Sequence, residues 1–190
     1  MTKFSIRSVC IYCGSSPGKN AAFVEQATNL GAALAGHDIR TVYGGGDRGL
    51  MGAVARGALA SGGQVLGIIP EFLQQKEQTG GTDTLPGVDM HVVRDMHTRK
   101  QKMFEEADAF IALPGGIGTL EELIEIMTWA QLGRHNKPIA LLNVNNFWSP
   151  LIDLLEHMND QGFIHAPQRA ELLLASNVPD LLAQLGFEAR

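Results

Sequence analysis

The chain has 190 residues, of which 45% are hydrophobic, so it is long and apolar enough to bury the core of one compact domain spanning residues 1–190. Its formal net charge of −5 argues against a nucleic-acid partner, because a protein that neutralises many phosphates usually carries a basic stripe. The first apolar run, residues 9–13, is too brief for a secretory signal or a membrane span. We therefore expect a cytoplasmic protein that acts on a small molecule and has no membrane partner.

Short apolar, β-branched runs alternate with segments of helical period along the whole chain. Six runs are typical of buried strands: residues 9–13, 40–43, 65–69, 90–93, 109–113 and 139–142. Six segments with turn residues near their ends predict helices: residues 21–35, 50–60, 99–107, 120–132, 150–160 and 179–184. Strands that alternate with helices predict an α/β fold of the Rossmann-like, doubly wound kind, in which a parallel sheet has helices on both faces.

The first predicted strand contains two cysteines, Cys10 and Cys13, with the spacing C-x-x-C. A redox-active pair of this kind needs the turn at a helix start. In a strand, alternate side chains point to opposite faces, which separates the two sulfurs by side. We therefore expect no redox function from this motif.

Four loops that follow predicted strands are unusual: residues 14–18, residues 44–49, the stretch from Pro70 onward, and residues 114–119. In doubly wound folds the ligand binds outside the carboxyl ends of the strands, so these loops are where a site is expected. From the first two loops we take four candidate substrate-binding residues, Gly14, Ser15, Gly45 and Gly46. Residues 71–87 lack clear periodicity, and we expect them to form a surface excursion near the mouth of the site.

The loop at residues 114–119 predicts an anion site. Its sequence is Pro114-Gly115-Gly116-Ile117-Gly118-Thr119, and it follows a strongly apolar strand and opens a helix. This arrangement aims free backbone N–H groups and the positive end of the helix at an anion. The three glycines lack the Cβ atoms that would hold a phosphate at a distance. The alternative is a tight turn without a ligand.

The loop at residues 44–49, Gly44-Gly45-Gly46-Asp47-Arg48-Gly49, also fits the dinucleotide fingerprint G-x-G-x-x-G. The acidic residue that this fingerprint requires would be Glu71, which stands beyond the predicted strand end. A dinucleotide would also leave the second glycine turn unexplained. Neither turn continues into the Gly-Lys-Ser/Thr of a nucleoside triphosphatase.

Two cations, Arg99 and Lys100, stand in the first turn of a predicted helix, for which Thr98 would be the N-cap and Gln101 its reciprocal capping-box partner. The helix dipole disfavours positive charge there by up to about 1 kcal/mol, so an anionic partner is a reasonable inference. A solvated surface pair is the alternative.

Two carboxylates, Glu121 and Glu122, follow the glycine turn directly. Glu122 could merely close a capping box with Thr119, and Glu121 could complement the helix dipole. A carboxylate beside a bound phosphate is repelled, however, unless a positive species lies between them. The oxocarbenium-like transition state of a ribosyl transfer would be such a species.

These residues closely resemble the LOG ("lonely guy") family. The resemblance is carried by Met96-His97-Thr98-Arg99-Lys100, by Asp108 to Leu113 with Pro114-Gly115-Gly116-x-Gly118-Thr119-x-x-Glu122, and by Val42 to Gly46 with Gly49-Leu50-Met51-Gly52. Gly67 to Pro70 and Thr128 to Gly133 also fit, so the resemblance covers nearly the whole chain.

The resemblance implies a Rossmann-like homodimer, or a larger homo-oligomer. It also implies that the protein hydrolyses N6-substituted adenosine 5′-monophosphates to the free base and ribose 5-phosphate, with AMP as a possible further substrate. Arg99 and Glu122 would be the catalytic pair. The implied nucleotide contacts, with Gly115 added from the turn, are Glu77, Lys100, Gly115, Gly116, Ile117, Gly118, Thr119, Leu120, Glu121 and Thr128. Glu77 departs from the usual family run.

Two other functions are weighed against this one. The family is also labelled lysine decarboxylase, a reaction that needs pyridoxal phosphate on a desolvated lysine, and Lys100 near the phosphate turn is the only lysine that suggests it. A non-catalytic nucleotide carrier or sensor has no evident need for Glu121 and Glu122. The six histidines show no ligand spacing, so we expect neither a metal nor a cofactor.

Overall fold

The computed structural model describes residues 5–78, 85–164 and 172–187, and of residues 75–78 it describes the helical backbone alone. Its centre is a seven-stranded sheet in which every neighbouring pair is parallel and the strand order is β4-β3-β2-β1-β5-β6-β7. The strands are β1 Ser8–Tyr12, β2 Arg40–Tyr43, β3 Val65–Pro70, β4 Asp89–Val93, β5 Ala109–Ala112, β6 Ile139–Leu142 and β7 Leu172–Ala175. The predicted doubly wound parallel sheet is confirmed.

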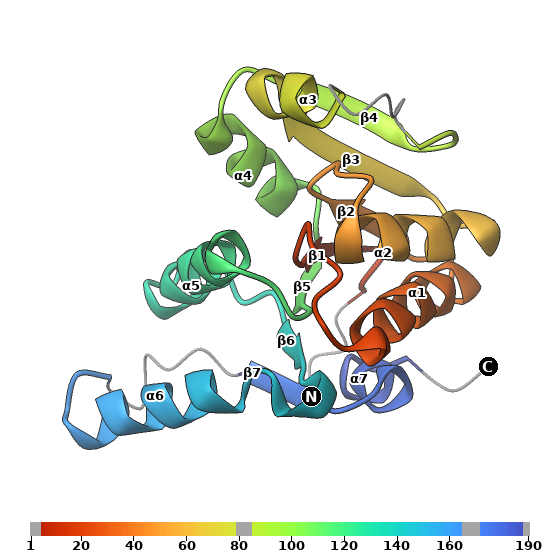
Figure 1. Cartoon of the computed structure of the whole chain (residues 1–190). Coiled ribbons are helices and arrows are strands. Elements are labelled where there is room, and N and C mark those ends of the chain that lie inside the picture. Colours follow the sequence, from red (N-terminus) through yellow and green to blue (C-terminus); the bar gives the residue numbers. More distant parts are fainter. Residues whose placement is uncertain (1–4, 79–84, 165–171, 188–190) are drawn as a thin grey trace.

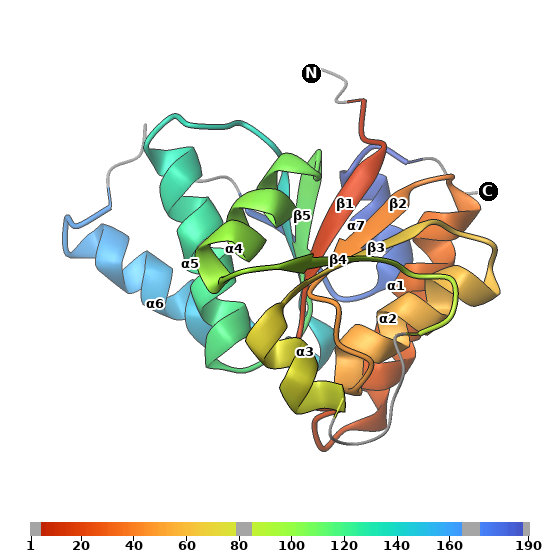
Figure 2. The same ribbon diagram turned by 90° about the horizontal axis from the view of Figure 1, so that it is seen from above.

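Helices cover both faces of this sheet (Figure 1). They are α1 Ala21–Gly36, α2 Gly49–Ala60, α3 Glu71–Gln78, α4 Met96–Glu105, α5 Ile117–Gln131, α6 Ser149–Asp160 and α7 Val178–Gln184, with a short 3₁₀ turn, η1, at Val144–Asn146. Figure 2 shows α1, α2 and α7 on one face and α4, α5 and α6 on the other. Within the described ranges, no helix is both long and apolar enough to span a membrane.

Alternate residues of the central strands pack into two separate cores. Val9 and Ile11 of β1 belong to the core under α1, α2 and α7, whereas Cys10 belongs to the core under α4, α5 and α6. Because both faces are covered, β1 and β5 are buried along their whole length, as the unbroken apolar runs predict. Cys13 lies in the first core, so the two thiols point to opposite sides, and burial raises the pKa of each. The redox interpretation is therefore excluded on geometry.

The pairing of the central strands determines where the site lies. β1 pairs with β2 on one side, Ile11 opposite Tyr43, and with β5 on the other, Tyr12 opposite Ala112. The helices that follow β1 and β5 leave toward opposite faces of the sheet. A crevice therefore opens between the two loops, at the point where a doubly wound sheet binds its ligand.

One helix and one strand were not predicted. Residues 71–78 form α3, although no periodicity marks them, and the surface excursion expected across residues 71–87 is therefore wrong in its first half. β7 was not predicted because its sequence, LLLA, consists of residues that favour helices. Its pairing with β6, from Ile139 opposite Leu172 to Leu142 opposite Ala175, outweighs that preference.

Candidate active site

The loops after β1 and β5 lie against each other. Gly14 N–H donates to the Pro114 carbonyl at 3.1 Å, which extends the strand pairing one step beyond the sheet. A Cβ on Gly14 would stand 3.3 Å from Gly115 Cα, which is tighter than ordinary contact. The glycines of the two loops thus allow a backbone approach that side chains would prevent.

Helix α5 begins one turn earlier than the sequence predicts, and no side chain caps its first turn. The N-cap is Gly116, which has no side chain to cap the helix, so Thr119 is a helical residue and not the cap that was weighed as an alternative. Gly116, Ile117 and Gly118 are exposed. The unpaired N–H groups and the positive end of the α5 dipole therefore face the crevice, as anion binding requires.

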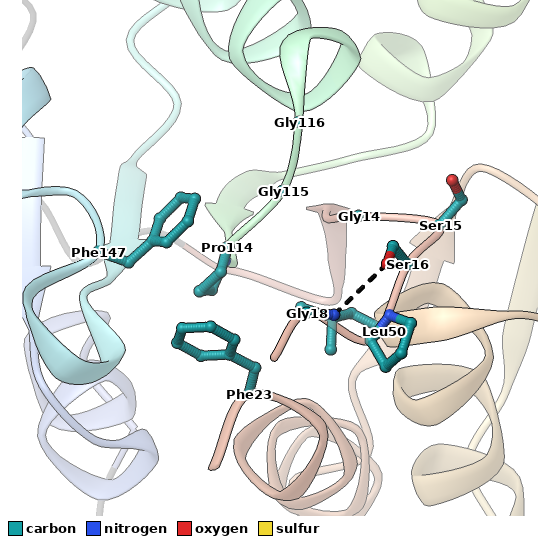
Figure 3. Close-up of a pocket in the computed structure, with 11 residues that line it drawn as sticks. Gly14, Ser15, Ser16, Gly18, Phe23, Leu50, Pro114, Gly115, Gly116 and Phe147 are labelled. Atoms are coloured by element: carbon teal, nitrogen blue, oxygen red, sulfur yellow. Dashed lines mark hydrogen bonds between the residues drawn. The ribbon is translucent and has the colours of Figure 1, made fainter. Parts of the chain in front are cut away.

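A cavity of about 310 Å³ lies in this crevice (Figure 3). It is lined by residues 14–18 and 114–116, Leu50, Phe23 and Phe147. Phe23 and Phe147 form an edge-to-face pair with ring centroids 5.9 Å apart at one side of the cavity, and Ser15 and Ser16 lie at the other. Of the predicted residues, the structure brings Gly14, Ser15, Gly115 and Gly116 together here. The two phenylalanines were missed, since neither stands in a motif.

Arg99 and Glu122 are brought together between α4 and α5. Arg99 is 6% exposed and Glu122 is 9% exposed, and Arg99 Nη1 lies 3.7 Å from Glu122 Oε1. This distance is within the range of an ion pair but is longer than a hydrogen bond. The predicted N-cap at Thr98 is wrong: Asp95 caps α4 by accepting from the Thr98 N–H at 2.7 Å, so Arg99 stands in the second turn and points inward.

The guanidinium of Arg99 is held by the carboxyl ends of two strands. Its Nε donates to the Ile68 carbonyl of β3 at 3.2 Å, and its Nη2 donates to the Gly44 carbonyl after β2 at 3.3 Å. These two bonds occupy two of the three guanidinium nitrogens. The third nitrogen, Nη1, donates to the Met96 sulfur at 3.7 Å and forms the ion pair with Glu122.

Glu122 is a buried carboxylate rather than a cap. Burial raises its pKa above the ordinary 4.5, Arg99 opposes this shift, and the neighbouring Glu121 adds to it. The alternative of a capping box with Thr119 is excluded, because Glu122 lies on the inner face of α5 beside Leu123. A carboxylate with a raised pKa next to a fixed cation can stabilise positive charge and accept a proton.

Lys100 lies on α4 beside Arg99 and is engaged by two carboxylates of α5. Its Nζ lies 2.7 Å from Glu121 Oε1 and 3.0 Å from Glu125 Oε1. Burial by itself would lower the pKa of Lys100, but the two carboxylates together raise it. Glu125 was missed, although its position four residues after Glu121 places both on one face of a helix.

Four of the remaining predicted residues, Gly45, Gly46, Thr128 and Leu120, make other contacts in the structure. Gly45 has φ +81° and packs against Ile69 and Met90, and Gly46 is buried beside it. Thr128 donates to the Ile124 carbonyl of its own helix at 2.7 Å and lines a second cavity, of about 240 Å³, between α5 and α6. Leu120 packs into the core below α4 and α5. The side chain of Glu77 lies outside the described residues.

Helix α2 is less suited than α5 to hold a phosphate. Its first residue is Gly49, but the N–H groups of Leu50 and Met51 donate to the Gly14 carbonyl at 3.0 and 3.3 Å. Those donors are occupied inside the protein, which argues against a dinucleotide pyrophosphate at the loop of residues 44–49. Among the described residues, no group of three or more His, Cys, Asp or Glu side chains could hold a metal ion.

Comparison with known proteins identifies the relatives of this chain. The family described as "Possible lysine decarboxylase" matches residues 51–185. The cytokinin riboside 5′-monophosphate phosphoribohydrolase LOG7 of Arabidopsis thaliana is 46% identical over 184 residues, which are 97% of this chain and 83% of that protein. The cytokinin riboside 5′-monophosphate phosphoribohydrolase of Rhodococcoides fascians is 42% identical over 182 residues, covering 94% of this chain and 89% of that protein.

Solved structures share the fold at lower identity. The X-ray structure of TM1055 is 22% identical, with a TM-score of 0.71, and the match covers 95% of this chain and 98% of that one. The Moco carrier protein from Chlamydomonas reinhardtii is 21% identical, with a TM-score of 0.66 and 94% of each chain covered. These likenesses support the fold alone.

Proposed function

This chain belongs to the LOG family, and on that premise we propose that it is a cytokinin riboside 5′-monophosphate phosphoribohydrolase, an N-glycosidase that acts on N6-modified adenosine 5′-monophosphates and on AMP. The observation that carries the proposal is the buried pair of Arg99 and Glu122 beside the open first turn of α5. We further propose that the protein works in the cytoplasm.

The 5′-phosphate binds at the first turn of α5. The backbone N–H groups of residues 115–119 and the helix dipole attract the phosphate, and Gly14 and Ser15 close the other side of the crevice. Because Glu122 lies on the same helix, a phosphate held there places the ribose near its carboxylate. Fixing the ribose in this way supplies the orientation that a bimolecular attack by water would otherwise lack.

The pair then acts on the glycosidic bond. The C1′–N9 bond breaks with its electron pair leaving on the purine, and a water oxygen forms the new bond to C1′. Glu122 stabilises the positive charge that develops at C1′ and accepts a proton from the water, a role that its raised pKa favours. Arg99 stays protonated, so it acts as a fixed cation toward the phosphate or the departing purine.

Lys100 and Lys137 do not fit decarboxylation, which the family description also raises. A Schiff-base lysine needs a desolvated amine with a lowered pKa, whereas the pKa of Lys100 is raised by Glu121 and Glu125. The pKa of Lys137 is lowered by burial, but its Nζ donates to the Phe104 carbonyl at the last turn of α4. Neither of these two lysines therefore fits the Schiff-base role that pyridoxal phosphate requires.

A homodimer is part of the proposal. The face formed by α5, α6 and the segment after α6 exposes Ile124, Leu154, Met158 and Phe163, around the cavity that Thr128 lines. An exposed apolar patch of this kind favours contact with another protein surface. Leu154→Glu should convert the dimer to a monomer in sedimentation, and a variant that stays dimeric would place the interface elsewhere.

The test of the activity is release of free base from AMP and from N6-isopentenyl-AMP, followed by chromatography. We expect Glu122→Gln and Arg99→Ala to lower kcat by about 10²–10³, because each removes a charge that acts in the transition state. Glu105→Gln, which changes an exposed carboxylate at the end of α4, is the matched control and should leave kcat unchanged.

Two outcomes would contradict the proposal in different ways. Base release that neither substitution lowers would reject the mechanism. A wild-type protein that binds nucleotide but releases no base would favour the carrier or sensor function instead.

A further inference from the structure

Gly44 and Arg99 occupy complementary space at the carboxyl ends of β2 and β3. A Cβ built on Gly44 would overlap Arg99 Nη2 and stand 3.2 Å from Arg99 Cζ. Gly44 does not have a positive φ, so its backbone conformation alone does not require glycine. The space that the guanidinium fills therefore gives a physical reason for a glycine at this position.

The carbonyl of Gly44 also accepts a hydrogen bond from the guanidinium for which the missing side chain leaves space. This carbonyl accepts from Arg99 Nη2 at 3.3 Å, and the Ile68 carbonyl of the next strand accepts from Nε at 3.2 Å. Two acceptors fixed in adjacent strands determine the plane of a guanidinium, because its donors form a rigid fork. In that plane the third nitrogen, Nη1, lies 3.7 Å from Glu122 Oε1, and it also donates to the Met96 sulfur at 3.7 Å.

We propose that Gly44 is a positioning residue for Arg99: the absent Cβ opens the space for the guanidinium, and the Gly44 carbonyl, with that of Ile68, directs Nη1 at Glu122. The first glycine of the triplet thus serves the arginine of α4 rather than a nucleotide. Gly45, in contrast, has a positive φ and packs against Ile69 and Met90. The effect on activity rests on the proposed function, whereas the effect on packing does not.

The consequence of adding a methyl group at position 44 is specific. Arg99 Nη2 is the far end of a side chain, so the protein can accommodate alanine by moving the guanidinium rather than the strand. The moved guanidinium loses at least its bond to Gly44 and its alignment with Glu122. The Met51 sulfur would stand 3.2 Å from the new Cβ, but a thioether adapts readily.

The experiment is a double-mutant cycle of Gly44→Ala and Arg99→Ala, with thermal melting and base release as readouts. Gly36→Ala, at the end of α1, is the matched control, because a Cβ there would meet nothing within 4 Å. Gly44→Ala should lower the melting temperature in the wild-type background but not in the Arg99→Ala background. It should lower kcat by about 10²–10³ with a smaller change in KM, as expected when a transition-state charge is misplaced.

An equal loss of melting temperature from Gly44→Ala in both backgrounds would overturn the proposal, since it would show that the methyl group meets something other than Arg99. If Gly44→Ala alone fails to fold, the double variant decides: recovery of folding supports the proposal, and failure overturns it. If the wild type releases no base, the proposed function fails, and the melting cycle still tests the role of Gly44.

Discussion

Replacing Lys100 by methionine separates two roles for this residue. The resemblance to the LOG family implies a nucleotide contact, whereas the structure shows Lys100 between α4 and α5, bound to Glu121 at 2.7 Å and Glu125 at 3.0 Å. Methionine keeps most of the length and the apolar stem and removes only the charge. We expect Lys100→Met to weaken the attachment of α4, which carries Arg99, to α5, which carries Glu122.

The magnitude follows from the exposure of the two partners. Ion pairs of exposed side chains contribute about 0.2–1 kcal/mol each. The side chain of Glu121 is 53% exposed and that of Glu125 is 25% exposed, so the first pair belongs at the low end of this range and the second at the high end. A total of about 0.5–1.5 kcal/mol corresponds to a fall of roughly 1–6 °C in melting temperature for a chain of this size. The fall should shrink at high salt, which screens such pairs.

The assay combines melting with the pH dependence of base release. Lys100 lowers the pKa of Glu122, so its loss should move the acid limb of kcat/KM to higher pH and leave kcat at alkaline pH nearly unchanged. Lys102→Met, about 200° around α4 from Lys100, is the control. An unchanged melting temperature together with a tenfold or greater rise in KM would refute the reasoning and assign Lys100 to the nucleotide.

Three further results are expected. Because burial raises the pKa of Glu122, the contribution of this residue to stability falls as pH rises from 4.5 through the raised value. The melting temperature of Glu122→Gln relative to wild type should therefore increase between about pH 4 and about pH 7. A difference that stays constant with pH would contradict this. Gly115→Ala places a Cβ against the Thr119 side chain, and this overpacking should lower the free energy of unfolding in urea by about 1–3 kcal/mol. The same variant should bind AMP more weakly in calorimetry. Unaltered binding would show that the turn does not hold the phosphate. Trp148→Phe removes the indole N–H bond to the Ala112 carbonyl, 3.2 Å long, and should cost about 1–3 kcal/mol of unfolding free energy, so an unchanged value would refute the contribution of that bond.

Local sequence patterns did not predict the first residues of α4 and α5 correctly. Asp95 and Thr98 are both residues that cap helices, and the preference of Asp over Thr is small enough that the local sequence alone does not decide between them. α4 takes the earlier cap, which adds a turn of helix and places Arg99 inward. Likewise α5 begins at Ile117, so Glu122 faces the core instead of reaching back to Thr119. In both helices one turn of difference decides whether a charged side chain lies in the first turn or is buried.

The sequence by itself determined the alternation of strands and helices and the placement of glycine turns at strand ends, and it marked Arg99, Lys100, Glu121 and Glu122 as candidate site residues. These inferences depend on periodicity and on the chemistry of short segments, which the chain carries locally. Only the tertiary structure decided that Gly44 and Ile68 hold Arg99, that Lys100 lies between Glu121 and Glu125, and that Phe23 and Phe147 close the crevice. Each of these contacts joins segments remote in sequence, and they meet because the order of the parallel strands places their carboxyl ends along one edge of the sheet.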